Sequence, residues 1–410
     1  MTAKTTESTT SFADLGLSAR TLTAVTREGF TQPTPIQQAA IPAGLSGRDV
    51  IGIAQTGTGK TLAFGLPMLE RVLNDGVGLV LAPTRELALQ IEETLRRVGS
   101  SFGIRTAVLI GGAPMGRQIS LLRSRPHVII ATPGRLLDHL TQNTIRLDQV
   151  SVAVLDEADR MLDMGFLPAI RKILLRVPAK RQTMLFSATM PPEIAKLANE
   201  FQQNAIRVEV APAGTTAELV DQELHLVPQI DKLSFLEKLL GDNSGTILVF
   251  ARTRHGAKKV AKQVRLMGHS AAELHSDRTL AQRKAALEGF KHGTYRVLVA
   301  TDIAARGIDV KQISVVVNFD LPDQPEDYIH RIGRTGRAGE TGRAITIATP
   351  EQVGEVRRIE RLIGRHLLPS SVRPAESAHG HFGANRGPSN RFPRPRAPQA
   401  QRRTPQTARR

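Results

Sequence analysis

The sequence contains no cysteine and no tryptophan, and only two tyrosines among its 410 residues. The lack of cysteine excludes a disulfide scaffold but indicates no redox compartment, because a chain without thiols folds in either. No apolar run reaches the ~18–20 residues that span a membrane. The first ten residues, rich in Thr and Ser, lack the apolar core of a secretory signal. These absences predict a soluble, cytoplasmic protein with no membrane contact.

Acidic residues are scarce relative to basic ones. The chain has 55 Lys and Arg against 38 Asp and Glu, which gives a formal net charge of +17. Such an excess favours a polyanionic partner, above all nucleic acid. Residues 371–410 hold nine Arg, no Lys and one acidic residue, and so carry +8 of the total. The charge therefore divides between an Arg-rich end and a mildly basic body.

Two stretches interrupt the regular part of the chain. The Arg- and Pro-rich end has too few apolar residues to offset its ordering entropy, which predicts disorder. The Pro, Gly and Thr residues of 210–216 are typical of a linker. We predict a flexible arm over 1–11, a first domain over 12–208, a linker over 209–220, a second domain over 221–368 and a disordered tail over 369–410.

Short β-branched runs alternate with longer amphipathic segments on both sides of the linker. This alternation is typical of βα units around a parallel sheet and predicts an α/β fold with two similar parallel-sheet domains in tandem. The expected strands of the first domain are 50–53, 79–82, 107–110, 128–131, 152–155 and 183–186. Those of the second domain are 247–250, 271–274, 297–300, 315–317 and 345–347.

A glycine-rich segment follows the first expected strand, at the strand end where open parallel sheets bind ligands. Its residues are Ala54, Gln55, Thr56, Gly57, Thr58, Gly59, Lys60 and Thr61. Such a turn directs backbone N–H groups at phosphates, while Lys60 supplies a charge and Thr61 a Mg²⁺ ligand. The strict phosphate-loop pattern has Gly at position 54, where this chain has Ala. The alternative is a glycine-rich turn with a chance lysine.

Three carboxylates follow the expected strand 152–155, in the sequence Asp156-Glu-Ala-Asp159. They would repel one another unless a Mg²⁺–nucleotide complex supplied positive charge. We predict that Asp156 holds the metal and that Glu157 orients and deprotonates the attacking water. The alternative is a set of acidic residues favoured at a helix N-terminus.

Basic residues gather in the second domain between His330 and Arg337, interleaved with glycines that disfavour a plain helix face. Arg334 and Arg337 lie three residues apart and can point together at one phosphate. Planar, permanently charged guanidinium groups suit a γ-phosphate whose charge spreads in the transition state. A structural ion-pair network is the alternative.

These segments resemble, in order, those of the DEAD-box ATP-dependent RNA helicases, over about residues 12–350. The matching segments are Phe12, Gly29-Phe-Thr-Gln-Pro-Thr-Pro-Ile-Gln37, the glycine-rich loop, Pro83-Thr-Arg-Glu-Leu-Ala88, Gly111-Gly112, Thr132-Pro-Gly-Arg135, Asp156–Asp159, Ser187-Ala-Thr189, Val249-Phe250, 275–283, 300–309 and 330–337. The resemblance implies RecA-like domains and an adenine-reading segment over 12–38. The segment 275–283 and the basic tail are similar to the bacterial RhlE-like branch, although Leu280 stands where many members have Gln.

The resemblance also implies roles for individual residues. It places Phe30, Thr34, Gln37 and Asp309 at the nucleotide, with Phe30 stacking on adenine and Gln37 bonding its edge. The implied RNA contacts, to phosphates and 2′-hydroxyls, are Pro83, Thr84, Arg85, Gly112, Thr132, Gly134, Arg135, Arg252, Arg278, Thr301 and Gly307. Residues that link the ATP site to domain closure are Asp159, Ser187, Thr189, Arg306 and His330.

The function expected is RNA-stimulated hydrolysis of ATP to ADP and phosphate, coupled to closure of the domains on single-stranded RNA and to local unwinding of short duplexes. The cofactors expected are ATP and Mg²⁺. An ATP-gated RNA clamp that remodels ribonucleoproteins with little unwinding needs the same residues, and a DNA helicase of the same two-domain superfamily is a third alternative. We expect a monomer with ribosomal or RNA-decay assemblies as candidate partners. The role of the tail stays open: it could bind RNA, protein or lipid, or serve only as a solvated linker.

Overall fold

A computed structural model describes residues 10–55, 57–74, 76–210, 220–305, 313–336 and 342–367, and the structural statements about this chain concern these residues. Residues 1–367 form one unit and 368–410 a second one. The predicted tail, most of the predicted arm and linker, and five predicted site residues lie outside the described residues; the five are Thr56, Arg306, Gly307, Asp309 and Arg337. The predicted domain boundaries stay predictions.

The first domain is built on a seven-stranded sheet in which every pairing is parallel, with strand order β3-β4-β2-β5-β6-β1-β7. Its strands are β1 (Val50–Ile53), β2 (Val77–Leu81), β3 (Thr106–Leu109), β4 (Val128–Ala131), β5 (Val150–Asp156), β6 (Gln182–Ser187) and β7 (Ile206–Glu209). Its α-helices are α1 (Ala19–Arg27), α2 (Pro35–Leu45), α3 (Lys60–Val72), α4 (Arg85–Gly99), α5 (Met115–Arg123), α6 (Pro133–Thr141), α7 (Ala158–Asp163), α8 (Leu167–Leu174) and α9 (Pro192–Phe201). Short 3₁₀ turns cover Phe12–Leu15 and Ser100–Phe102.

The second domain repeats this plan with a six-stranded parallel sheet of order β10-β11-β9-β12-β13-β8. Its strands are β8 (Val220–Leu226), β9 (Ile247–Phe250), β10 (Ala271–Leu274), β11 (Val297–Ala300), β12 (Val315–Asn318) and β13 (Gly342–Ala348). Its helices are α11 (Lys232–Asp242), α12 (Arg254–Leu266), α13 (Leu280–Lys291), α14 (Asp302–Ala305), α15 (Pro325–Ile332) and α16 (Val353–Ile363), with a 3₁₀ turn at Pro350–Gln352.

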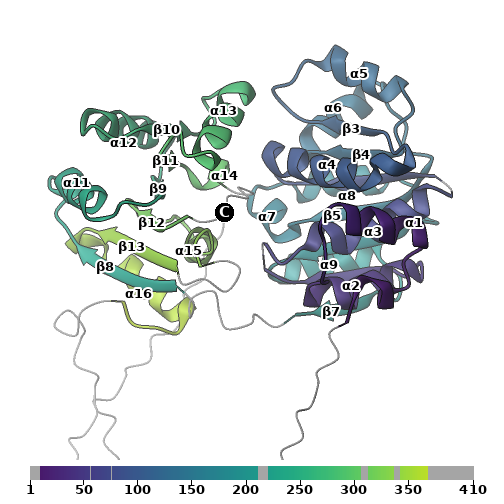
Figure 1. Cartoon of the computed structure of the whole chain (residues 1–410), viewed down its shortest axis with the longest axis horizontal. Coiled ribbons are helices and arrows are strands. Elements are labelled where there is room, and N and C mark those ends of the chain that lie inside the picture. The colour runs from purple at the N-terminus through teal and green to yellow at the C-terminus, as the bar shows by residue number, and fades with distance from the viewer. Residues whose placement is uncertain are drawn as a thin grey trace, which may run out of the picture. The chain divides into compact units, whose positions relative to one another are not determined.

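Helices pack on both faces of each sheet (Figure 1). In the first domain, one apolar cluster joins the sheet to α2, α3 and α4, and a second joins its other face to α6, α8 and α9. The central strands are therefore buried on both sides, which explains why they consist of continuous apolar runs. Burial on both faces leaves the strand ends as the places where polar groups meet ligands.

All eleven predicted strands are present, with ends shifted by one to three residues in several cases. β2, for example, covers 77–81 rather than 79–82. The sequence patterns missed β7 and β8, which are the outermost strands of their sheets. No helix within the described part of the chain has the length and apolarity that crossing a membrane requires.

Candidate functional site

The glycine-rich loop connects the end of β1 to the start of α3, as its sequence predicts. Gly59 has φ +89°, a left-handed conformation that favours glycine, and immediately precedes Lys60, the first residue of α3. The Lys60 ammonium is buried and donates a hydrogen bond of 2.8 Å to the Ala54 carbonyl. The Thr58 hydroxyl donates to the Gln55 carbonyl at 2.7 Å. The loop is therefore a closed turn with a cation at its centre, directly before a helix N-terminus.

Gln37 joins the loop to the N-terminus of α2. Its side-chain oxygen accepts a hydrogen bond of 3.0 Å from the Thr34 backbone N–H, and its Nε2 donates one of 3.0 Å to the Gly59 carbonyl. A Cβ at Gly59 would lie 2.3 Å from that Nε2, so the close approach requires glycine. Phe30 is half-buried and packs against the domain core. The adenine contacts expected of Phe30 and Gln37 stay predictions.

Asp156 ends β5, and Glu157 follows it in a left-handed conformation (φ 54°) that is uncommon for residues other than glycine. Both side chains are buried. Burial raises the pKa of Asp156 to about 7, against the opposing charge of Lys60 and with further repulsion from Glu157. Burial would also raise the pKa of Glu157, but Arg160, Lys60 and Arg334 together lower it. The cluster therefore keeps Glu157 ionised, whereas burial shifts Asp156 toward its neutral form.

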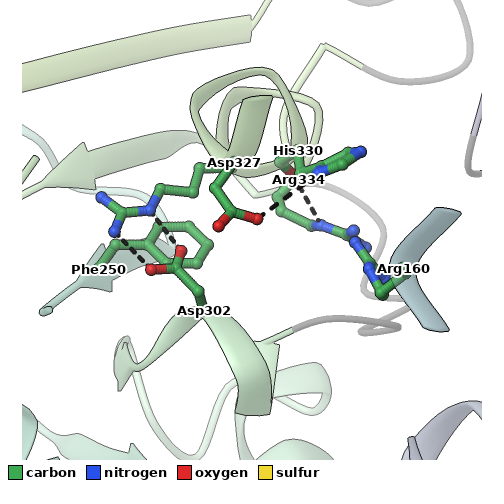
Figure 2. A pocket seen from close by; sticks show the side chains of 7 residues that line it. Arg160, Phe250, Asp302, Asp327, His330 and Arg334 are labelled. Carbon is green, nitrogen blue, oxygen red and sulfur yellow. Dashed lines mark hydrogen bonds and ion pairs between the residues drawn. The ribbon is translucent and has the colours of Figure 1, made fainter. Parts of the chain in front are cut away.

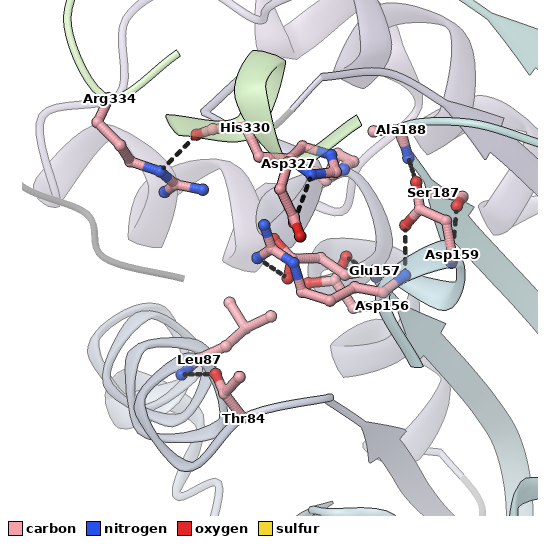
Figure 3. Close-up of polar contacts among 12 residues, drawn as sticks. Thr84, Leu87, Asp156, Glu157, Asp159, Ser187, Ala188, Asp327, His330 and Arg334 are labelled. Carbon is pink, nitrogen blue, oxygen red and sulfur yellow. Dashed lines mark hydrogen bonds and ion pairs between the residues drawn. The ribbon is translucent and has the colours of Figure 1, made fainter. Parts of the chain in front are cut away.

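Asp159 links this cluster to the end of β6. Its Oδ2 accepts hydrogen bonds from the backbone N–H of Ala188 at 3.1 Å, and from the N–H and hydroxyl of Thr189 at 2.8 and 2.9 Å. The Asp159 backbone N–H donates to the Ser187 hydroxyl at 3.1 Å (Figure 3). Burial would raise the pKa of Asp159, but Lys60 and these hydrogen bonds lower it. Three residues predicted to couple the two domains therefore form one network.

The donor set at this edge suits Mg²⁺, which prefers oxygen ligands and commonly takes one or two from the protein and the rest from water and phosphates. Asp156 offers a carboxylate at the end of β5, and Thr61 a hydroxyl at the start of α3. Across the described ranges, no group of three or more acidic, His or Cys side chains is arranged to hold a metal ion. The residues therefore fit a magnesium ion that arrives with a nucleotide rather than one held by protein ligands alone.

In the second domain, Arg331 has a structural place. It is buried, bonds the Asp302 carboxylate through Nε at 2.5 Å and Nη2 at 2.7 Å, and donates to the Asp320 carbonyl at 2.6 Å. Its guanidinium also lies over the Phe250 ring. Arg331 thus belongs to a structural ion-pair network, the alternative considered for this basic segment. The site prediction did not include Arg331.

Arg334 is placed differently from Arg331. Its Nε donates to the His330 carbonyl at 3.2 Å, and its positive charge contributes to the lowered pKa of Glu157. It lines a small pocket with Asp327, His330 and Arg160 (Figure 2). Arg160 is the buried partner of Glu157, at 2.6 Å. The structure therefore brings Arg334 within electrostatic reach of the predicted general base.

Two predicted RNA-contacting segments of the first domain, those of Arg85 and Arg135, lie next to a third, the glycine pair Gly111 and Gly112. Thr84 caps α4 by accepting a hydrogen bond from the Leu87 N–H at 3.2 Å (Figure 3). The adjacent Arg85 guanidinium packs on the glycines, since a Cβ at Gly112 would lie 2.4 Å from its Nη1. Arg135, near the start of α6, donates to the Ala113 carbonyl at 2.9 Å. Arg85 thus packs on the glycine pair itself, and Arg135 bonds the residue that follows it.

A buried polar network that the sequence patterns did not reveal supports this loop. Gln118 on α5 accepts from the Ile110 N–H at 3.1 Å and donates to the carbonyls of Ile110 and Ala113 at 3.2 and 3.1 Å. His139 on α6 places Nε2 3.3 Å from the Gln118 oxygen and Nδ1 2.7 Å from the Thr144 hydroxyl. Burial lowers the pKa of His139, so the ring is neutral and donates from Nε2. Fixed hydrogen bonds on both sides thus set the conformation of the loop.

The predicted RNA-contacting arginines of the second domain have protein partners in the structure. Arg252 forms ion pairs with Asp323 at 3.3 Å and Glu355 at 3.1 Å, and Arg278 pairs with Glu273. The Thr301 backbone N–H is bonded to the Leu274 carbonyl, at the carboxyl end of β10. These residues lie at the ligand-bearing edge of the second sheet, but an RNA phosphate would have to compete with acidic side chains for both arginines.

This fold and site together define a class: an ATPase with two tandem RecA-like domains, a glycine-rich loop before a helix and a buried acidic cluster. Two family models match the chain, "DEAD/DEAH box helicase" over residues 34–197 and "Helicase conserved C-terminal domain" over residues 231–339.

Relatives and solved structures agree with these models. The chain is 46% identical over 362 residues to the DEAD-box ATP-dependent RNA helicase CshA of Geobacillus kaustophilus, covering 87% of this chain and 78% of that protein. It is 45% identical over 363 residues to CshA of Bacillus subtilis, covering 88% and 74%. Yeast (S. cerevisiae) Dbp5 bound to RNA and ADP BeF3 superposes with a TM-score of 0.78 at 32% identity, covering 87% of this chain and 94% of that chain. Mss116p bound to ssRNA and AMP-PNP gives a TM-score of 0.80 at 27% identity, covering 90% and 80%.

The chain belongs to the DEAD-box ATP-dependent RNA helicases. It is accordingly an enzyme that binds RNA and hydrolyses ATP. The finer prediction of an RhlE-like branch is not supported by these relatives, which are CshA proteins.

Proposed function

We propose that ATP hydrolysis takes place at the edge of the first sheet, between the glycine-rich loop and the Asp156–Asp159 cluster. The loop residues 54–61 bind the phosphates, with Lys60 leaving the Ala54 carbonyl to contact the β- and γ-phosphates. Thr61 and Asp156 hold Mg²⁺, which neutralises phosphate charge when bound. The observation that supports this most is that Lys60, Asp156 and Glu157 are buried together at the carboxyl edge of the first sheet.

Within this site, Glu157 positions and deprotonates the attacking water, and Arg334 stabilises the charge that develops on the γ-phosphate. Arg337, Arg306 and Asp309, which fall outside the described residues, keep the roles that the family resemblance gives them. Asp159 links the site to the segment Ser187–Thr189 through four hydrogen bonds, one with Ser187, one with Ala188 and two with Thr189. We propose His330 as their partner from the second domain.

RNA is proposed to bind along the first-domain segments that surround the glycine pair and at the strand ends of the second domain. Backbone N–H groups, Thr84 and the two arginines Arg85 and Arg135 suit phosphates and 2′-hydroxyls rather than base edges. Binding of this kind carries little sequence information. We therefore propose single-stranded and short duplex RNA of no fixed sequence as the substrate.

Lys60→Ala is expected to weaken ATP binding about 10- to 100-fold, because it removes a charge-assisted contact with the phosphates. Equilibrium titration with a fluorescent ATP analogue measures this directly. Lys172→Ala, an exposed lysine on α8, serves as the control and should bind the analogue like the unmodified chain. Unchanged affinity in Lys60→Ala would contradict the proposed position of the phosphates.

Gly134→Ala tests the RNA path. A Cβ at Gly134 meets no atom within 4 Å and the residue is the second of α6, so alanine fits the fold and stabilises the helix by up to ~1 kcal/mol. The absence of a side chain there is explained by the close approach of an RNA backbone. We expect about tenfold weaker RNA binding with a melting temperature that is unchanged or slightly raised, measured by fluorescence anisotropy and thermal denaturation.

The matched control is Gly354→Ala. Gly354 is likewise the second residue of a helix, α16, with open space around its missing Cβ. It should leave RNA affinity unchanged and alter stability to a similar small degree, because it makes the same change at the same helix position. Equal RNA affinities for the two alanine variants would remove Gly134 from the proposed path.

Unwinding and clamping are separated by a duplex-release assay under single-turnover conditions. Release of a labelled strand together with RNA-stimulated ATP hydrolysis supports unwinding as the main activity. Stimulated hydrolysis without strand release would instead support the clamp. Equal stimulation by DNA and RNA would argue for a DNA helicase of the same superfamily. A monomeric state, a cytoplasmic location, ribosomal or RNA-decay assemblies and an RhlE-like branch stay predictions from the sequence.

A further inference from the structure

Helix α12 of the second domain has two sharply different faces. Its buried side consists of Ala257, Val260, Ala261 and Val264, which pack against the sheet. The side turned to solvent carries six basic residues, all exposed: Arg254, His255, Lys258, Lys259, Lys262 and Arg265. At 100° per residue, Arg254, Lys258, Lys262 and Arg265 fall within about 80° of one another on the helix surface. We call these six residues the α12 basic face.

The α12 basic face lacks the acidic residues that usually balance such a surface. The sequence has no Asp or Glu from residue 251 to residue 272. Arg254 pairs with Asp277 at 2.7 Å, from outside the helix. Within the described residues, Lys258, Lys259 and Lys262 form no ion pair of 4 Å or less. Three neighbouring lysines are therefore left to solvent.

This arrangement costs the helix stability. Like charges four residues apart, such as Lys258 and Lys262, repel each other and so destabilise the helix. The Arg254 cation in the first turn also opposes the positive end of the helix dipole. A helix whose only role was to cover the sheet would gain from glutamate at several of these positions. An anionic partner offsets both costs.

The position of α12 points to the partner. Thr253 caps the helix immediately after β9, so the basic face begins at the carboxyl edge of the second sheet, beside the predicted RNA contact Arg252. From Arg254 to Arg265 it then extends ~17 Å away from that edge, at 1.5 Å per residue. At ~3.4 Å per nucleotide of a stacked strand, this length spans about five phosphates.

We propose that the α12 basic face binds the phosphate backbone of RNA that extends beyond the core binding site. The inference rests on the proposed RNA path at the edge of the second sheet. Lysines supply point charges without directional preference, and α12 carries no Phe, Tyr or Trp on which a base could stack. The surface therefore adds affinity for longer RNA without adding sequence preference, and its contribution falls as salt rises.

The test uses the full chain and the triple variant Lys258→Gln, Lys259→Gln, Lys262→Gln. Glutamine keeps the length and helix propensity of lysine, so folding is preserved. The matched control removes the same charge from exposed lysines of the first domain: Lys172→Gln, Lys180→Gln, Lys196→Gln. Affinities for single-stranded RNA of about 10 and about 25 nucleotides are measured by anisotropy across a salt series.

The unmodified chain and the control should bind the longer RNA more tightly than the shorter one. In the α12 variant we expect that ratio to fall about tenfold at low salt. The slope of log affinity against log salt for the longer RNA should become shallower by about 2, at 0.7 per lost phosphate contact. An unchanged ratio and slope would overturn the proposal and would favour an acidic protein surface as the partner of the α12 basic face. Failure of every chain, unmodified included, to bind the shorter RNA would instead overturn the proposed function.

Discussion

Glu157→Gln is expected to lower RNA-stimulated ATP turnover by about 10²–10⁴-fold while ATP and RNA binding remain within a few-fold of the unmodified chain. The loss follows from the proposed role, because glutamine cannot accept the proton of the attacking water. Binding persists because Lys60, Thr61 and Asp156, which contact phosphates and metal in the proposal, are unchanged. Since hydrolysis precedes release of RNA in this account, the variant should also form long-lived complexes with RNA and ATP.

A structural effect of the same substitution must be measured separately, since Glu157 is the buried partner of Arg160 at 2.6 Å. The glutamine oxygen can still accept a hydrogen bond from Arg160, so the melting temperature should change little. Glu200→Gln, which alters an exposed pair with Arg171 at 2.9 Å, is the control and should keep full turnover. Retained RNA-stimulated hydrolysis in Glu157→Gln would contradict the assignment of the base.

Arg334→Lys is expected to lower turnover by about 10³-fold or more, the usual effect of losing an arginine that stabilises a transferring phosphoryl group. Lysine keeps the charge but cannot reproduce the planar, two-pronged contact. Single-turnover ATP hydrolysis at saturating RNA measures the chemical step. A decrease confined to the apparent affinity for ATP, with the chemical step unchanged, would assign Arg334 to ground-state binding instead.

Arg331→Lys provides the contrasting control for the same chemical change. Arg331 bonds Asp302 through two nitrogens and lies buried among Phe250 and the Asp320 carbonyl. Its substitution should lower the melting temperature by roughly 4–8 °C, equivalent to about 2 kcal/mol, whereas Arg334→Lys should not. If the two variants lose stability equally, Arg334 stabilises the fold as Arg331 does.

The central strands were predictable because burial on both faces makes them continuous apolar runs. β7 and β8 were not, and their sequences show why. Apolar and charged residues alternate in Ile206–Glu209, and Val220–Leu226 contains three polar residues in a row, as an outermost strand with a less covered side allows. The search for apolar runs therefore finds the central strands and the edge strands β3 and β10, but misses the more polar edge strands β7 and β8.

The position of the candidate ATP-site residues was predictable for a similar reason: they come directly after strands, so chain order alone places Lys60 and Asp156 at one edge of the sheet. Contacts that arise from packing were not predictable. Arg331 has Asp302 as its partner 29 residues away, and Gln118 meets His139 21 residues away, because of how the helices lie on the sheets. The different pKa shifts of Asp156 and Glu157 likewise depend on burial and on the position of Arg160.

ATP binding and RNA binding by this chain are expected to be energetically coupled, so that each ligand strengthens the binding of the other. The affinity for a non-hydrolysable ATP analogue, measured with and without saturating single-stranded RNA, tests it most directly. We expect RNA to raise the affinity for the analogue about 5- to 150-fold. The analogue should raise the affinity for RNA by the same factor, because coupling between two binding sites is reciprocal. Equal affinity for the analogue in the presence and absence of RNA would contradict the account.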